Sequence, residues 1–261
     1  MKTMASAAQS GLASLGQYRR ERPLELDDDR FVKVHEWFLR QLSTIDSLDH
    51  LNDAERASCR EFCSRCQKRY LAIKEALANK NMLAVASKNG TPTGENLGGF
   101  GRKIYDRVRD LRKLVDFHNC ENIAMVGNGA FPATLLWLRD NFPMLRYIGL
   151  DIDPGCVKMA TELVAAFGID NVDFKLIDGR QYDFCCTDFV YVANHVVPKK
   201  AVLEQIARSR SVRQVVVREP TPVGELLAEA VRPDLPLVFV VDGAGAAGGI
   251  SMSYDLLLRR V

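Results

Sequence analysis

The spacing of apolar residues divides the chain into two parts. As far as residue 118, apolar side chains recur every three to four residues, as they do on one face of an amphipathic helix. This pattern predicts helices over residues 30–51, 53–79 and 102–117, with a glycine- and proline-containing loop over 88–99. From residue 122, short apolar runs alternate with helix-like segments. That alternation is typical of a parallel sheet with crossover helices.

The second part predicts a sheet built from strand–helix steps and closed by a hairpin. The expected strands are 123–126, 147–151, 172–177, 188–193, 214–217, 237–241 and 252–258. The expected helices are 132–141, 154–167, 199–208 and 223–231. The last two strands have no helix between them, so we expect them to pair through the glycine-rich stretch 242–249.

Five strands joined by crossover segments and followed by a closing hairpin are the plan of class I S-adenosylmethionine-dependent transferases. We therefore expect an α/β, Rossmann-like S-adenosylmethionine-binding domain over residues 119–261. An all-helical domain over residues 29–118 is expected to precede it, and residues 1–28 are expected to form a loose lead-in.

The first strand and the turn after it, Ile123–Thr134, carry the clearest chemical signal. An apolar run leads into Gly127 and Gly129, and the next apolar run ends at Asp151. A strand, a glycine turn, a helix and a second strand that ends in a carboxylate form a nucleotide-binding unit. Pro132 stands where a dinucleotide fingerprint has its third glycine, which disfavours a pyrophosphate ligand. The segment therefore favours S-adenosylmethionine, and a turn that binds no ligand is the alternative.

Ligands of such sheets bind at the carboxyl ends of the strands. We expect the cofactor to be bound by Gly127, Asn128, Gly129, Pro132, Asp151, Ile152, Asp178 and Asn194. His195 and Arg218 follow the fourth and fifth strands and are candidates for substrate binding. An arginine binds a carboxylate bidentately, but an ion pair between Arg218 and Glu219 or Asp242 is the alternative. For His195 the alternative is a structural histidine.

Composition narrows the classes of partner. The net charge of +2 gives no reason to expect nucleic acid or an anionic membrane as a partner. No apolar run has the length of a membrane span, and residues 1–28 have no apolar signal-peptide core. The odd number of cysteines, 7, favours reduced thiols and a cytoplasmic location.

Three of these cysteines have the spacing of an iron–sulfur motif. Cys59, Cys63 and Cys66 match the C-x3-C-x2-C pattern of radical S-adenosylmethionine enzymes. The same spacing places them on one face of a helix, and 53–79 contains neither glycine nor proline. We therefore expect packing residues and no iron–sulfur cluster. No metal site is expected elsewhere, because the 4 histidines are scattered.

A family resemblance extends these expectations. Val126–Thr134 resembles the glycine-, proline- and threonine-containing motif of nicotianamine synthases and their bacterial relatives, and Gly149–Pro154 resembles the acidic motif that follows it. Val217 and Arg218 resemble the arginine-ended fifth strand of that family. Among these relatives the chain is most similar to the short bacterial enzymes of opine-metallophore synthesis, the staphylopine and pseudopaline group. The resemblance is specific over 123–220.

The resemblance implies a reaction that differs from methyl transfer. Enzymes of this group move the 3-amino-3-carboxypropyl (aminobutanoyl) arm of S-adenosylmethionine to the α-amine of histidine and release methylthioadenosine. An opine dehydrogenase acts next in the pathway. A methyltransferase acting on a small amine is the alternative with the same cofactor. A non-catalytic S-adenosylmethionine-binding or dehydrogenase-like module is the alternative from another class. The choice between L- and D-histidine stays open, as does the oligomeric state, for which a homodimer is considered.

The family takes its general base from a glutamate of the helical domain. The segment Lys74–Leu83 matches that region best, which implies Glu75 as the base, with Glu36 and Glu61 as rivals. Glu36 is also a candidate for substrate binding. Tyr105 matches a family tyrosine near the reacting amine. The alternative for each is a solvated residue on a helix surface.

Overall fold

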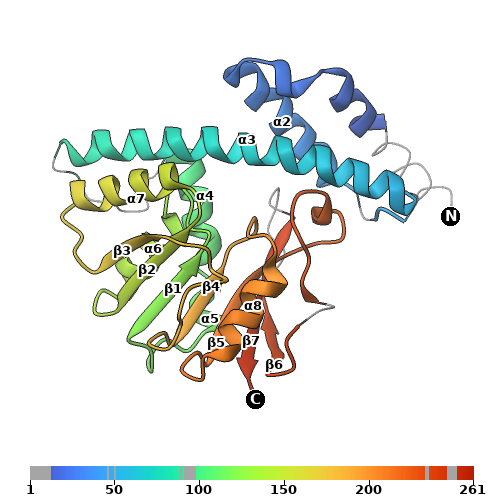
Figure 1. Cartoon of the computed structure of the whole chain (residues 1–261). Coiled ribbons are helices and arrows are strands. Elements are labelled where there is room, and N and C mark those ends of the chain that lie inside the picture. The colour runs from blue at the N-terminus through green and yellow to red at the C-terminus, as the bar shows by residue number, and fades with distance from the viewer. Residues whose placement is uncertain are drawn as a thin grey trace. The chain divides into compact units, whose positions relative to one another are not determined.

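The computed structural model describes residues 13–45, 47–49, 51–88, 90, 98–232, 235–245 and 252–261. These residues form two compact units (Figure 1). The first contains the described parts of Met1–Ile73, Pro220–Ala228 and Ala247–Tyr254, and the second contains Lys74–Glu219 with the described parts of Glu229–Ala246 and Asp255–Val261. The chain thus divides within a long helix and not at residue 118, because the end of that helix packs with the sheet.

The first unit is helical. It contains the 3-10 turn η1 (Pro23–Glu25), the helix α2 (Asp28–Leu42), the start of α3 (Asp53–Ala86) and the 3-10 turn η2 (Gly224–Leu226). Asp27 caps α2, because its side chain accepts a hydrogen bond from Arg30 N at 2.9 Å. The predicted helix 30–51 ends earlier, at Leu42, and the predicted helix 53–79 continues to Ala86.

The expected loose lead-in is wrong for its described residues. Residues 13–20 are helical, and Tyr18 is fully buried. The Tyr18 ring stacks on Phe38 with ring centroids 4.0 Å apart, and its hydroxyl lies 2.5 Å from Nδ1 of the buried His35. Burial lowers the pKa of His35 to about 4. This segment is therefore part of the helical core.

Cys59, Cys63 and Cys66 belong to the same core. All three side chains are buried, and they pack in one cluster with Tyr18 and Phe38. Burial raises the pKa of each thiol above its ordinary value. The three cysteines pack as the helical spacing predicts.

The second unit is built on a seven-stranded sheet of order β3-β2-β1-β4-β5-β7-β6. The strands are β1 (Asn122–Val126), β2 (Arg146–Asp151), β3 (Val172–Leu176), β4 (Phe189–Val192), β5 (Gln214–Pro220), β6 (Phe239–Ala244) and β7 (Ser253–Arg260). Strands β1 to β5 run parallel, and β6 and β7 form the expected antiparallel pair. The expected turn between β6 and β7 lies largely outside the described residues.

Helices cover the sheet of the second unit (Figure 1). They are α4 (Gly98–Val108), α5 (Leu111–Leu114), α6 (Ala133–Asn141), α7 (Pro154–Ala166) and α8 (Lys199–Arg208). Helix α7 packs against β2 and β3, and α4 packs against α6. The expected helix 102–117 is thus divided into α4 and α5, and most of the expected loop 88–99 lies outside the described residues. None of the helices that the structure describes has the length and hydropathy to cross a membrane.

The expected helix 223–231 is wrong. Only the short turn η2 forms there. The backbone N–H of Val231 donates to the Glu219 carboxylate at 3.1 Å, so it does not join a helical ladder. Gly224 approaches Met252 closely, because a Cβ at Gly224 would lie 2.1 Å from the Met252 carbonyl oxygen. Most apolar residues of 223–231 are thus buried without forming an α-helix, so their spacing does not reflect helix periodicity.

Candidate functional site

The glycine turn lies where the strand order of the sheet reverses. Strand β1 pairs with β2 on one side and with β4 on the other, and Val126 is in register with Leu150 and Val192. Gly127, Asp151 and the segment after β4 therefore meet at one edge. A Cβ at Gly127 would lie 2.7 Å from Val196, so the turn and that segment are in close contact. Ligands of open α/β sheets bind at this position.

The turn itself is held by Asp151. Asp151 Oδ2 accepts the Gly129 N–H at 2.9 Å, and Asp151 Oδ1 accepts the Asp153 N–H at 3.0 Å. Gly127 and Gly129 have φ values of 76° and 68°, which favour glycine. A carboxylate has about four lone-pair positions, so two remain for a ribose diol. The predicted glycines and acid thus meet in one turn.

Glu75 reaches the same turn from α3. Its Oε2 accepts the Ala130 N–H at 2.8 Å. A Cβ at Gly129 would lie within 2.9 Å of both Glu75 carboxylate oxygens. Position 129 therefore needs glycine for two reasons, the positive φ and the space that Glu75 occupies.

The Glu75 carboxyl group has an altered affinity for protons. Its pKa is raised to about 7, first because burial removes it from water and also because Asp151 carries the same charge nearby. The hydrogen bonds from the Ala130 and Phe131 N–H groups oppose this rise. A carboxyl group of this pKa exchanges its proton near neutral pH, which is what a general base requires.

The sequence interpretation missed Asn79, which lies one turn after Glu75 on α3. Asn79 is buried, and its Nδ2 donates to the Ala130 carbonyl at 3.0 Å and to the Met159 carbonyl at 2.9 Å. It thus ties the glycine turn to α3 and α7. The spacing from Glu75 was the available signal, because residues i and i+4 share one helix face.

Asn128 and Asn194 present polar atoms at the same edge. Asn128 Nδ2 donates to the Gly129 carbonyl at 2.6 Å. The Oδ1 atoms of Asn128 and Asn194 are buried, and neither has a hydrogen-bond partner among the described residues. Gly149 leaves room for Asn128, since a Cβ there would lie 2.7 Å from Asn128 Oδ1. Acceptors of this kind suit the amino or hydroxyl groups of a ligand.

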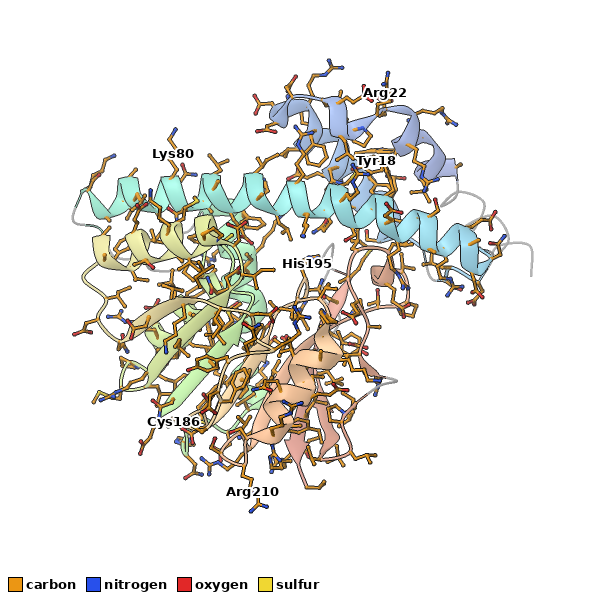
Figure 2. All side chains as sticks on the ribbon, in the orientation of Figure 1. Tyr18, Arg22, Lys80, Cys186, His195 and Arg210 are labelled. Atoms are coloured by element: carbon orange, nitrogen blue, oxygen red, sulfur yellow. The ribbon has the colours of Figure 1, made fainter. Side chains whose placement is uncertain are left out.

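Ile152 and His195 lie at the rim. Ile152 follows Asp151 directly and is 68% exposed. His195 is half-buried beyond the carboxyl end of β4 (Figure 2). Pro132 occupies the N-cap position of α6, directly after the turn. These three residues therefore lie on the elements where the sequence predicts ligand contacts.

Asp178 lies beyond the end of β3, where the Ile177 N–H donates to the Asp151 carbonyl at 2.9 Å. The Asp178 carboxylate accepts hydrogen bonds from the Arg180 guanidinium, the shortest at 2.5 Å. These bonds hold the pKa of Asp178 below its ordinary value. Asp178 is therefore ionised, and Arg180 competes with a ligand for its oxygens.

Arg218 is buried inside the sheet. Its Nη1 lies 3.1 Å from Asp255 Oδ1 on β7, and the same oxygen accepts the hydroxyl of Tyr191 at 3.0 Å. The alternative partners considered from the sequence, Glu219 and Asp242, are both wrong. Glu219 binds backbone N–H groups, and Asp242 pairs with Arg259 at 2.7 Å. A role for Arg218 with substrate stays a prediction.

Lys199 is a further buried charge beside Arg218. Its Nζ donates to the carbonyls of Arg218 at 2.7 Å and of Glu229 at 2.6 Å. Burial lowers the pKa of Lys199 to about 8. The lysine joins α8 to the end of β5 and so supports the rim.

The structure does not bring Tyr105 to the glycine turn. Its hydroxyl donates to Asp140 Oδ2 at 2.9 Å, near the C-terminal end of α6, whereas the turn precedes the N-terminal end of that helix. Tyr105 was expected near the amine from the family resemblance, which does not determine its position along α6. Glu36 belongs to the helical unit, where it accepts the Tyr70 hydroxyl at 3.1 Å. Of the expected catalytic residues, Glu75 alone contacts the turn in the part of the chain that the structure describes.

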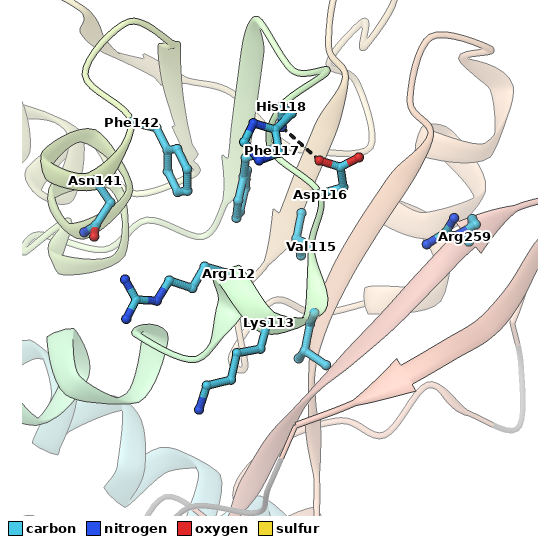
Figure 3. Close-up of a pocket in the computed structure, with 10 residues that line it drawn as sticks. Arg112, Lys113, Val115, Asp116, Phe117, His118, Asn141, Phe142 and Arg259 are labelled. Carbon is cyan, nitrogen blue, oxygen red and sulfur yellow. Dashed lines mark hydrogen bonds between the residues drawn. The ribbon is translucent and has the colours of Figure 1, made fainter.

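A hollow of about 560 Å³ lies elsewhere in the second unit (Figure 3). It is lined by Arg112–His118, Asn141, Phe142 and Arg259. Residues 112–118 precede β1, so the hollow lies at the opposite edge of the sheet from the glycine turn. None of the predicted site residues lines it.

Comparison with known proteins concerns the fold. No protein-family model matches the chain, and no curated protein matches it. A crystal structure of MtNAS, a nicotianamine synthase, in complex with MTA and tNA aligns with a TM-score of 0.77 at 17% identity and covers 97% of each chain. The fold of this chain is similar to that of MtNAS.

A second structure of MtNAS agrees. A glutamate-to-glutamine variant in complex with S-adenosylmethionine aligns with a TM-score of 0.64 at 18% identity, covering 95% of this chain and 97% of MtNAS. The predicted fold class, a Rossmann-like α/β transferase fold with an N-terminal helical region, is confirmed.

Proposed function

We propose that the protein transfers the 3-amino-3-carboxypropyl group of S-adenosylmethionine to the α-amine of histidine and releases methylthioadenosine. The observation that carries this proposal is the position of Glu75. Its carboxylate lies at the glycine turn, 2.8 Å from Ala130 N, with a pKa raised to about 7. A proton acceptor at a nucleotide-binding turn suits a reaction in which an amine attacks the nucleotide's own side chain.

The turn fits S-adenosylmethionine. Asp151 keeps free lone pairs for the ribose hydroxyls, and Gly127 and Gly129 let the backbone approach the ligand. Exposed Ile152 offers an apolar surface for adenine, and the buried Oδ1 atoms of Asn128 and Asn194 offer acceptors. Pro132 replaces the glycine that a pyrophosphate ligand favours. These features support adenosine without phosphates.

The proposed step balances simply. Nitrogen of the acceptor α-amine attacks the γ-carbon of the aminocarboxypropyl arm, and the bond between that carbon and the sulfonium sulfur breaks. The electron pair goes to sulfur, which leaves as the neutral thioether methylthioadenosine. The amine loses one proton, and Glu75 accepts it. An ionised amine has no lone pair, so a base at the site is necessary for attack.

The comparisons support the reaction type without extending to this chain's substrate. MtNAS was crystallised with MTA, and its glutamate-to-glutamine variant was crystallised with S-adenosylmethionine. Histidine as acceptor rests on the sequence resemblance, and His195, which follows β4, and Arg218, which lies on β5, are its proposed contacts. We further propose that the enzyme is cytoplasmic. Its product passes to an opine dehydrogenase in the synthesis of a nicotianamine-like metallophore. For the oligomeric state of the enzyme, a homodimer is the alternative to a monomer.

The second candidate function is methyl transfer to a small amine. The class I sheet order favours it, because the same sheet and glycine turn serve methyltransferases. The acceptor assay separates the two: the chain is incubated with S-adenosylmethionine and L-histidine, D-histidine or other amino acids, and the products are separated by chromatography. Methylthioadenosine formed only with a histidine supports the proposal. Turnover with other amines but not with histidine would contradict its acceptor.

A further inference from the structure

Cys185 and Cys186 are adjacent in sequence and differ from the other cysteines in exposure. Both are exposed, whereas Cys59, Cys63, Cys66 and Cys120 are buried and Cys156 is intermediate. Their Sγ atoms lie 3.6 Å apart. Neither thiol contributes to an apolar core, so packing does not explain the pair.

A β-turn presents the two thiols together. Thr187 N donates to the Phe184 carbonyl at 2.9 Å, which makes Cys185 and Cys186 the two central residues of the turn. In an extended strand, successive side chains point to opposite faces, so two neighbouring thiols would point apart. The turn instead brings both sulfurs to one side.

The base of this turn is fixed. The Phe184 side chain and Thr187 are buried. The Phe184 carbonyl also accepts the hydroxyls of Ser209 and Ser211, each at 2.9 Å. Cys185 N donates to Asp183 Oδ1 at 3.0 Å. The thiols are therefore preorganised at the tip of a rigid turn, which lowers the entropy cost of binding both at once.

The separation of the sulfurs selects a geometry. For a metal–sulfur bond of about 2.3 Å, sulfurs 3.6 Å apart subtend an angle of about 100° at the bound atom. This angle suits a tetrahedral or pyramidal centre and does not suit a linear one. A disulfide is disfavoured, because neighbouring Cα atoms are about 3.8 Å apart and disulfides usually need at least about 4.4 Å.

We propose that Cys185 and Cys186 form a bidentate dithiol site for a soft thiophilic centre with bent sulfur ligation, of the class of trivalent arsenic or Zn²⁺. Binding replaces both S–H bonds with bonds from sulfur to the centre and releases two protons. No group of three metal-ligating side chains occurs in the described residues. The dithiol therefore leaves the remaining coordination positions of Zn²⁺ to water or an external ligand.

The site is separate from the glycine turn. Cys186 precedes β4 and His195 follows it, so the two lie at opposite ends of that strand (Figure 2). The hydrogen bond with Cys186 and the Asp183 carboxylate raise the pKa of Cys185 to about 11.

Phenylarsine oxide tests this proposal, because its arsenic condenses with two thiols and releases one water. The full chain, reduced and freed of reductant, is treated with one equivalent and analysed by intact mass and peptide mapping. One adduct per chain on the peptide holding both cysteines is expected, with loss of two titratable thiols. Cys185→Ser and Cys186→Ser should each lose the adduct, and Cys156→Ser should keep it. A Zn²⁺ titration against a chromophoric chelator should show at least a tenfold weakening in the same two variants.

Two results would overturn the proposal. One is an adduct mapped to other cysteines. The other is an adduct that survives in both single-serine variants. Peptide mapping of the wild-type chain gives the answer even if a serine variant does not fold.

Discussion

Glu75 and Asn79, one helical turn apart on α3, hold the two ends of one residue in the glycine turn. Glu75 accepts the Ala130 N–H at 2.8 Å, and Asn79 donates to the Ala130 carbonyl at 3.0 Å. The proposed base and its support therefore come from the same helix face. Any movement of α3 relative to the turn would disturb both contacts.

Asn79→Leu tests this support. The substitution leaves the buried Ala130 carbonyl without this donor, at a cost of about 1–3 kcal/mol, and removes a second hydrogen bond to the part-buried Met159 carbonyl, worth about 0.5–1.5 kcal/mol. We expect the free energy of unfolding, measured with urea, to fall by roughly 1.5–4.5 kcal/mol. Asn81→Leu is the control, because Asn81 is exposed on the same helix. Equal stability of the two variants would show that the Asn79 contacts do not hold the turn.

Gly129→Ala tests the contact between the turn and Glu75. Gly129 and Gly168 have similar positive φ values, 68° and 62°, so alanine at either site incurs similar backbone strain. At Gly129 the new Cβ would collide with Glu75, at 2.4 Å from its Oε2. At Gly168 no atom lies within 4 Å of the new Cβ. We expect turnover to be lost in Gly129→Ala and kept in Gly168→Ala. A Gly129→Ala enzyme with the turnover of Gly168→Ala would remove the reason for glycine at position 129. A valine at position 129 should in addition block S-adenosylmethionine.

Asp151→Ala tests the ribose assignment. Removing the carboxylate deletes charge-assisted hydrogen bonds worth about 1–3 kcal/mol, which corresponds to a Kd for S-adenosylmethionine raised roughly 5- to 150-fold. Isothermal titration calorimetry measures this change. Asp170→Ala is the control, because Asp170 is exposed and precedes β3. An unchanged affinity in Asp151→Ala would place the ribose elsewhere.

Glu75→Gln should remove a pH dependence of both activity and stability. The folded-state pKa of about 7 lies above the ordinary value of 4.5, so the folded chain binds more protons than the unfolded chain between these values. The free energy of unfolding contributed by Glu75 therefore falls as the pH rises from about 4.5 to 7. Activity should rise over the upper part of that range as the base ionises.

In Glu75→Gln the acid limb of the profile of kcat/KM against pH should disappear together with most of the turnover, while cofactor affinity changes little. The control is Glu61→Gln, since Glu61 is exposed on the same helix. Near-full turnover in Glu75→Gln would show that Glu75 is not the base.

The sequence predicted the elements from β1 to α8 better than the segments before and after them. Strand and helix bounds from β1 to α8 agree with the structure within about one or two residues, because buried parallel strands are short apolar runs between turn residues. The helix predicted over 223–231 was wrong because Val223, Leu226 and Val231 are buried in an irregular segment. An apolar pattern does not distinguish such a segment from a helix. The helix over residues 13–20 was not predicted, because the polar composition of this segment did not indicate that Tyr18 is buried.

The candidate site shows the same limit. Gly127, Gly129 and Asp151 follow strands, and strand ends determine where they meet. The position of Arg218 also follows from its strand. Its ion-pair partner, Asp255, is distant in sequence and was therefore not predicted. Tyr105 packs near the C-terminal end of α6, away from the turn, because a resemblance in sequence does not determine where one helix meets another.

The nucleoside product tests the central claim most directly. The full chain is incubated with S-adenosylmethionine and histidine, and the adenosine-containing product is identified by chromatography beside authentic standards. Attack on the aminocarboxypropyl arm predicts methylthioadenosine, with Glu75→Gln forming little of it. S-adenosylhomocysteine as the product would contradict the proposal and make the protein a methyltransferase.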